Sequence, residues 1–362
     1  MKLSPALEKS YASERLSALQ AQRLAHEISF GPVVFQVSRL MVKFGIMQLL
    51  LDSAAGLTTD EVSAGTGLSR YAAQTLLESS LTIGTVHCAE GRFTASKAGW
   101  FLLNDPLVSV NMSFNHDVNY LGLFRLEEAL LNGAPEGLKV FGEWATIYEG
   151  LSELPAQVRK SWLDFDHYYS DAAFDEALKV VFARRPRTLL DVGGNTGRWA
   201  LRCTDYDPDV RVTVMDLPAQ VEMMKRRTAG RKGADRISGC AADLLDRRAP
   251  FPAGFDAIWM SQFLDCFPDE EVTRILARAA ASMSADATLF IMETFWDRQR
   301  FETAAYCLTQ ISLYFTAMAN GNSKMYHSED MMRCTEAAGL EIENIIDGAG
   351  KGHTLLVCRK KQ

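Results

Sequence analysis

The chain has 362 residues, a length that predicts about two domains. Apolar side chains make up 48% of the residues and charged ones 23%, as in globular proteins that bury a full core. The formal net charge of −7 argues against a nucleic-acid partner, since there is no basic excess to neutralise phosphates. The chain also lacks an apolar run near the ~18 residues of a membrane span and a signal-peptide core.

The cysteines are odd in number and scattered, and no pair forms a C-x-x-C motif. This usage argues against a zinc or disulfide scaffold and favours reduced thiols in a cytoplasmic enzyme. The seven positions are Cys88, Cys203, Cys240, Cys266, Cys307, Cys334 and Cys358.

Residues 1–105 have apolar positions spaced three and four apart, which predicts helices. A helix from Tyr71 to Leu81 precedes a predicted hairpin at 86–94 that turns at Glu90-Gly91. Helix, turn, helix and hairpin in this order indicate a winged-helix unit. A DNA-reading helix needs basic side chains, yet only Arg70 precedes this one. We therefore interpret residues 1–105 as a dimerisation module.

Residues 106–182 are predicted to be helical and rich in aromatic side chains, and strands and helices alternate over 183–362. Alternation of this kind predicts an α/β fold, a doubly wound parallel sheet with ligands at the carboxyl ends of its strands. A helix is expected over 269–283. The expected strands are 188–192, 210–215, 237–241, 257–260, 288–292, 341–346 and 354–358.

Acidic residues follow three successive predicted strands. Asp191 precedes a glycine-rich turn at Gly193 and Gly194, whose flexible backbone lets a ligand approach closely. Asp216 ends the next strand, where an acid can hold both ribose hydroxyls, and Asp243 follows the third, where it could accept from an adenine amino group. Together they predict a nucleoside-binding site.

With these motifs the chain resembles the S-adenosylmethionine-dependent small-molecule O-methyltransferases that carry an N-terminal winged-helix dimerisation domain. The resemblance extends from about residue 32 to 359. It implies a class I methyltransferase fold, a homodimer, S-adenosylmethionine as methyl donor with S-adenosylhomocysteine as product, and no metal. It places Gly193 and Ser261 against the methionine portion, Asp216 at the ribose and Asp243 at the adenine. The implied cofactor-binding residues are Asp191, Gly193, Gly194, Asp216, Leu217, Asp243, Leu244 and Ser261.

The chain departs from this family at the catalytic base. In relatives, the second histidine of the motif H-x-L-H-D-W-x-D deprotonates the acceptor hydroxyl. In this chain Asp265 occupies the position of that histidine. Glu293 matches one of the two acids that orient that histidine, while the second is lost. A phenol near pKa 10 faces a gap of about 6 pKa units, roughly 8 kcal/mol, when it gives its proton to an ordinary Asp, against roughly 5 kcal/mol for a histidine.

Three alternatives follow for the base. In the first, burial and the nearby Glu293 raise the pKa of Asp265, so that Asp265 is the base. In the second, His116 or His167 is the base. In the third, the acceptor is unusually acidic and needs only a weak base. The loss of the histidine also admits methylation of an aromatic ring carbon beside a hydroxyl, and, less favoured, a catalytically inactive cofactor-binding subunit.

The resemblance implies a small aromatic, phenol-like acceptor of secondary metabolism, free or tethered to a carrier protein. An apolar pocket suits such a planar ring. The residues expected to line it are Phe114, Trp162, Phe263, Phe315 and Met318.

Overall fold

The computed structural model describes residues 3, 5–249 and 251–361, and the chain forms two compact units. One unit is Ser13–Asp117, and the other joins Met1–Ala12 to Val118–Gln362. The larger unit thus includes most of the helical stretch 106–182 together with the α/β half. The division into three parts at residues 105 and 182 stays a prediction.

The Ser13–Asp117 unit is helical with one small hairpin, in the winged-helix order. The predicted helix over 71–81 is α6, and the predicted hairpin pairs β1 with β2 in antiparallel register through Val86↔Ala95. Its elements are α2 (Ala18–Ser29), α3 (Gly31–Lys43), α4 (Ile46–Asp52), α5 (Thr59–Thr66), α6 (Arg70–Ile83), β1 (Val86–Ala89), β2 (Arg92–Ala95), α7 (Lys97–Asn104) and α8 (Pro106–Phe114).

Local sequence explains the start of α5. The Thr58 side chain accepts from the Glu61 backbone N–H at 3.2 Å, and the Glu61 carboxylate accepts from the Thr58 N–H at 2.7 Å, a capping box that satisfies two donors at the helix start. Met41, Met47 and Leu77 are fully buried in the core of this unit. α2 buries none of its residues.

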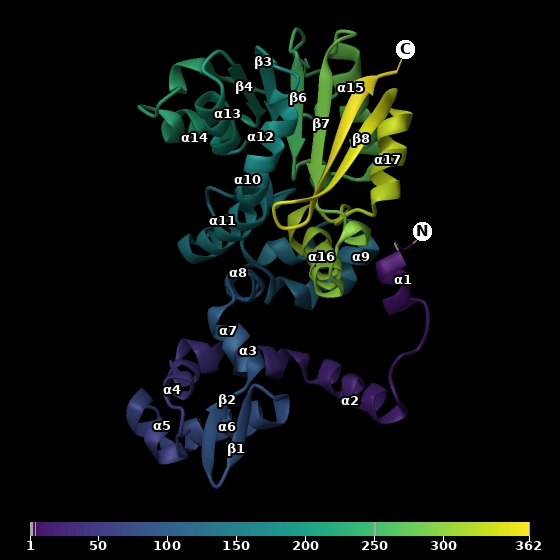
Figure 1. Cartoon of the computed structure of the whole chain (residues 1–362). Helices are drawn as coiled ribbons and strands as arrows, with labels where there is room; N and C mark the ends of the chain where they lie inside the picture. The colour runs from purple at the N-terminus through teal and green to yellow at the C-terminus, as the bar shows by residue number, and fades with distance from the viewer. Residues whose placement is uncertain (1–2, 4, 250, 362) are drawn as a thin grey trace. The chain divides into compact units, whose positions relative to one another are not determined.

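The larger unit is built on a seven-stranded sheet with the strand order β5-β4-β3-β6-β7-β9-β8 (Figure 1). Every predicted strand is present, with bounds within four residues of those expected. The strands are β3 (Thr188–Val192), β4 (Arg211–Asp216), β5 (Ile237–Ala241), β6 (Ala257–Ser261), β7 (Thr288–Glu293), β8 (Leu340–Ala349) and β9 (His353–Lys360).

The sheet differs from the prediction at one edge, because β9 runs antiparallel to both β7 and β8. No helix separates β8 from β9: the chain reverses within a few residues that contain Gly350 and Gly352, both at positive φ. A short connection can join only antiparallel neighbours, since a parallel pair needs a long crossover. The remaining pairs, β5·β4, β4·β3, β3·β6 and β6·β7, are parallel as expected.

Helices cover both faces of the sheet. Leu189 packs in one core cluster and the next residue, Leu190, in the other, as the two-residue period of a strand requires. One cluster holds residues of α15 (Asp269–Ser282) and α17 (Ser328–Ala337), and the other residues of α12 (Phe174–Phe182), α13 (Arg198–Tyr206) and α14 (Pro218–Thr228). The predicted helix over 269–283 is α15, which begins with three acidic residues.

Further helical segments precede the sheet, lie between its strands or follow β7. They are α1 (Pro5–Tyr11), η1 (Asn115–Asn119), η2 (Gly122–Arg125), α9 (Leu126–Asn132), η3 (Glu136–Val140), α10 (Ile147–Gly150), α11 (Ala156–Ser170), η4 (Asp171–Ala173), η5 (Ala234–Arg236), η6 (Leu264–Cys266), η7 (Trp296–Arg298), α16 (Glu302–Tyr314) and η8 (Phe315–Ala319). Within the described residues, no single helix has the length and hydropathy of a membrane span, although α3 and α4, bent by 61°, pass that test as a pair.

Candidate active site

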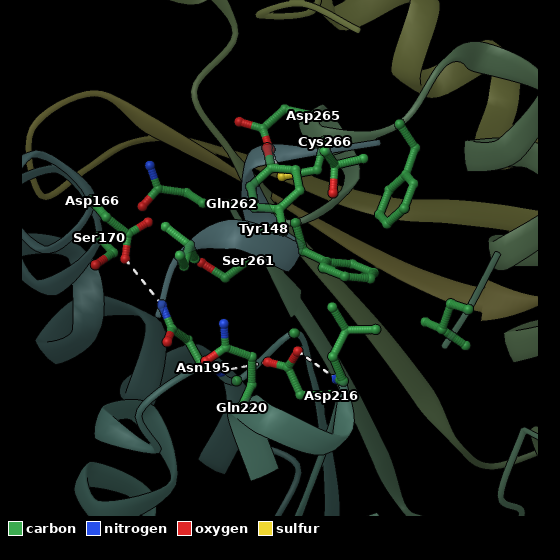
Figure 2. Close-up of a pocket in the computed structure, with 18 of the residues that line it drawn as sticks. Tyr148, Asp166, Ser170, Asn195, Asp216, Gln220, Ser261, Gln262, Asp265 and Cys266 are labelled. Carbon is green, nitrogen blue, oxygen red and sulfur yellow. Dashed lines mark hydrogen bonds between the residues drawn. The ribbon is translucent and has the colours of Figure 1, made fainter. Parts of the chain in front are cut away.

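A cavity of about 640 Å³ opens at the carboxyl edge of the sheet, within the larger unit. Parallel strands end there: β3 ends one residue after Asp191, β4 ends at Asp216 and β6 ends at Ser261, and these three residues line the cavity. Figure 2 shows Asp216 and Gln220 at one end of the cavity and Asp265, Cys266 and Tyr148 at the other, with Ser261 between.

The glycine-rich turn after β3 forms part of the cavity wall. Gly193 has φ +74°, and a Cβ added there would lie 2.3 Å from the Phe263 ring. A Cβ on Gly194 would lie 2.4 Å from the Asp191 carboxylate. Asn195 also adopts a positive φ, 46°. Gly193 and Gly194 therefore have no room for a side chain, and their backbone lies against the cavity.

Two carboxyls lie at the ends of β3 and β4, of which Asp191 is buried and Asp216 is half-buried. Asp216 accepts from the backbone N–H of Asn195 at 2.8 Å and of Leu217 at 2.7 Å, while burial raises its pKa. Asp191 is 2% exposed, and burial, together with the nearby Asp216, raises its pKa to about 8. The backbone thus holds Asp216 in place, with lone pairs left for a ligand.

A third carboxyl, which is buried, lies at the other end of the cavity. Asp265, 6% exposed, accepts a hydrogen bond from the Cys266 thiol at 3.5 Å. Burial raises the pKa of Asp265 to about 6, against the opposing effect of that thiol. Glu293 lies behind it and accepts from the backbone N–H groups of Phe263 and Leu264 at 3.1 and 2.9 Å. Burial and the charge of Asp265 raise the pKa of Glu293 well above its usual range.

Aromatic rings wall the end of the cavity that holds Asp265. The Trp162 indole N–H donates to the Tyr314 hydroxyl at 2.6 Å, and the rings of Phe263 and Phe267 meet edge to face at 5.0 Å. Burial and Cys266 raise the pKa of Tyr148 well above 10, so this hydroxyl keeps its proton. The aromatic lining residues include Tyr148, Trp162, Phe165, Phe263, Phe267, Tyr314 and Phe315.

The cavity brings together most of the residues singled out in the sequence. All eight residues expected at the cofactor line it, as do Asp265, His167 and three of the five expected pocket residues. In order these are Asp191, Gly193, Gly194, Asp216, Leu217, Asp243, Leu244, Ser261, Asp265, His167, Trp162, Phe263 and Phe315.

Four of the expected residues lie elsewhere. Phe114 and His116 belong to the Ser13–Asp117 unit, where Gln36 lies 3.4 Å from the His116 ring. Met318 is fully buried on the face of η8 that packs against Gly122, where its sulfur fills the space of a missing Cβ. Glu293 faces the backbone beneath the cavity wall.

Several lining residues escaped the sequence analysis, among them Asp166, Gln220 and Gln262. Gln262 has a positive φ, 46°, which nothing in its sequence context indicates. Asp166 precedes the candidate His167, and its Oδ2 lies 3.7 Å from the histidine Nδ1. Gln220 lies in the first turn of α14, two residues after the Pro218 that opens this helix. The position of Gln220 in this first turn, at the carboxyl edge of the sheet, is the sequence signal that could have identified it as a lining residue.

Several buried polar atoms of the cavity lining lack a hydrogen-bond partner, as expected where a ligand binds. Each atom is buried and finds no hydrogen-bond partner among the described residues, a costly state unless a ligand or water completes it. Among them are Asp191 Oδ2, Asn195 Oδ1, Gln220 Oε1 and Gln262 Oε1. No three His, Cys, Asp or Glu side chains in the described part of the chain are placed to hold a metal ion.

Comparison with known proteins identifies the family. The model of the O-methyltransferase domain matches residues 125–340, well over half of the chain, and that of the Dimerisation2-like domain matches residues 22–93. The chain belongs to the O-methyltransferase family. It is an S-adenosylmethionine-dependent methyltransferase with a dimerisation domain, so the predicted family, fold and cofactor are confirmed.

Individual relatives of this methyltransferase are distant. It is 23% identical to the L-tyrosine C(3)-methyltransferase of Streptomyces lavendulae, with 83% of this chain and 81% of that protein aligned. It is 24% identical to the demethylspheroidene O-methyltransferase of Rhodobacter capsulatus, over 86% and 75% of the two chains. Among solved structures it is similar to the S-adenosylmethionine-dependent methyltransferase SibL, with TM-score 0.70, 21% identity, and 93% and 98% of the chains covered.

Proposed function

We propose that this methyltransferase transfers the methyl group of S-adenosylmethionine to a planar, phenol-like acceptor. The observation that carries the proposal is one continuous cavity, with backbone-anchored Asp216 at one end and the buried carboxyl Asp265 among aromatic rings at the other. Aromatic walls match a flat ring and exclude water, so positioning alone supplies much of the rate of an in-line displacement.

The lining residues fit the methyl donor. Asp216, held by two backbone N–H groups, can accept from both ribose hydroxyls, and Gln220 lies beside it (Figure 2). Asp243 is exposed at the rim, and its Oδ1 accepts from the Leu245 N–H at 2.8 Å, leaving Oδ2 for an adenine amino group. When bound, S-adenosylmethionine supplies an electrophilic methyl group on a cationic sulfur.

Asp265 is the proposed base. With its pKa raised to about 6, the gap to a phenol near pKa 10 narrows to about 4 pKa units, roughly 5 kcal/mol. That gap is close to the one an ordinary histidine would face. Burial thus makes Asp265 about as basic as the histidine that it replaces. His167 is the alternative, although burial lowers its pKa.

Methylation of a ring carbon is the second candidate. The observation in its favour is the carboxyl in place of the family histidine, together with the similarity to an enzyme named for C(3)-methylation of L-tyrosine. A base that removes the phenol proton activates the ortho and para carbons as well as the oxygen.

The experiment is turnover of the purified full-length chain with S-adenosylmethionine and a panel of monohydroxy aromatic compounds, followed by mass spectrometry. Demethylation of the product by hydrogen iodide cleaves an O-methyl group and leaves a C-methyl group. Methylated product supports the proposal. Binding of S-adenosylmethionine without turnover of any hydroxy aromatic, free or carrier-bound, would support the inactive-subunit alternative.

We also propose that the protein is a cytoplasmic homodimer. Support for self-association comes from the match of residues 22–93 to a dimerisation domain and from exposed apolar side chains such as Leu19 and Ile28 on α2. The scattered cysteines, which form no C-x-x-C motif, support a reducing compartment.

A further inference from the structure

One corner of the cavity brings together side-chain acceptors of Asp166, Asn195 and Gln262. Asp166, on α11, lies beside the glycine-rich turn, where the Asn195 side-chain N–H₂ donates to its Oδ2 at 3.4 Å. Figure 2 shows Gln262 pointing to the same side of the cavity as Asp166. The three side chains come from separate elements, α11, the turn after β3 and the turn after β6.

Two of the acceptors in this corner lack partners. Asn195 Oδ1 and Gln262 Oε1 are buried and have no hydrogen-bond partner among the described residues. An ionised Asp166 adds only acceptor oxygens. A group with several N–H donors and a positive charge would satisfy all of them at once.

The corner also lies where the amino-acid tail of the methyl donor has to extend. With the adenosine held between Asp216 and Asp243, as proposed above, the rest of the molecule follows the Gly193–Asn195 turn. That tail ends in an α-ammonium group with three N–H donors and a carboxylate. We propose that Asp166 binds the α-ammonium group of S-adenosylmethionine, with the side-chain oxygens of Asn195 and Gln262 as further acceptors.

The charges that face Asp166 determine the pH range in which it is ionised and can bind an ammonium group. Burial raises its pKa to about 7, helped by Asp171 and Asp265, while Arg198 opposes the rise. Arg198 is itself ion-paired with Asp171, and His167 Nδ1 lies 3.7 Å from Asp166. Only the ionised carboxylate attracts an ammonium group. Affinity for a ligand that carries this group therefore rises from pH 6 to pH 8.

The test compares ligands that differ only in the tail, by titration calorimetry of the full-length chain. S-adenosylhomocysteine carries the ammonium group, its desamino analogue lacks only that group, and 5′-methylthioadenosine lacks the whole tail. Asp166→Asn should weaken S-adenosylhomocysteine binding roughly tenfold to a hundredfold, as for a hydrogen bond to a charged group. Affinity for the other two ligands should change less than about twofold. The matched control is Asp164→Asn on the same helix, half-exposed and paired with Lys160, which should change nothing.

Two results would overturn the assignment: an equal effect of Asp166→Asn on all three ligands, or no effect on S-adenosylhomocysteine. The wild-type protein gives an independent measurement that needs no folded variant. Its affinity for S-adenosylhomocysteine relative to the desamino analogue should rise severalfold from pH 6 to pH 8, and a constant ratio would contradict the proposal. Failure of all three ligands to bind the wild type would instead refute the cofactor site itself.

Discussion

Asp265→Asn is predicted to abolish most turnover while leaving the cofactor end of the cavity intact. The amide keeps the size of the buried side chain but cannot take a proton from the acceptor. General-base catalysis contributes typically a hundredfold to ten-thousandfold, so kcat should fall at least a hundredfold, about 3 kcal/mol in activation free energy. Affinity for S-adenosylhomocysteine should stay within about twofold, since Asp216 and Asp243 are untouched.

The pH profile makes this prediction specific to a base. Asp265 acts only when ionised, so kcat/KM of the wild type should rise through about pH 6, the pKa to which burial raises Asp265, and level off above. Asp265→Asn should lose this rise, and Asp265→His should regain much of the rate, because an imidazole near pKa 6.5 restores a base. The control is Asp269→Asn, half-exposed at the start of α15 and outside the cavity lining. Near-normal turnover by Asp265→Asn would refute the reasoning and direct attention to His167.

Gly193→Ala should weaken S-adenosylhomocysteine binding at least tenfold, since its Cβ would meet the Phe263 ring at 2.3 Å. Gly254→Ala, also at positive φ but in open space, should cost only about 1 kcal/mol of stability in urea unfolding; equal losses of affinity would contradict this steric account. In the ligand-free protein, Asp191→Asn should be more stabilising at pH 8 than at pH 5. The unfolded chain releases a proton that the folded one keeps up to about pH 8, so wild-type stability falls from pH 5 to pH 8 by up to about 4 kcal/mol; an equal effect at both pH values would disprove it. Leu19→Asp, at a 78% exposed position of α2, should shift the protein from dimer to monomer in sedimentation equilibrium, and an unchanged dimer would place the interface elsewhere.

Much of the fold follows from patterns that act over short distances. Alternating core residues such as Leu189 and Leu190 fix the strands, and the acids at the start of α15 fix its first turn. The cofactor end was predictable for the same reason, since Asp191, Asp216 and Asp243 each follow a strand and parallel strands end at one edge.

The acceptor end was harder to predict because segments far apart in the sequence build it. Tyr148 precedes the sheet by forty residues, and Tyr314 follows its last parallel strand, yet both line the cavity with Cys266. Met318 carries no signal that separates a residue packed on Gly122 from one that faces a cavity. The pKa of Asp265 likewise depends on burial, which the local sequence does not encode.

The central claim is that the carboxyl edge of the sheet binds the methyl donor, and titration of the full-length wild type with S-adenosylhomocysteine tests it most directly. The account predicts saturable binding at one site per chain, weakened at least tenfold by Asp216→Asn in a variant whose thermal melting stays cooperative. Absence of saturable heat with the wild type, or undiminished affinity in Asp216→Asn, would contradict it.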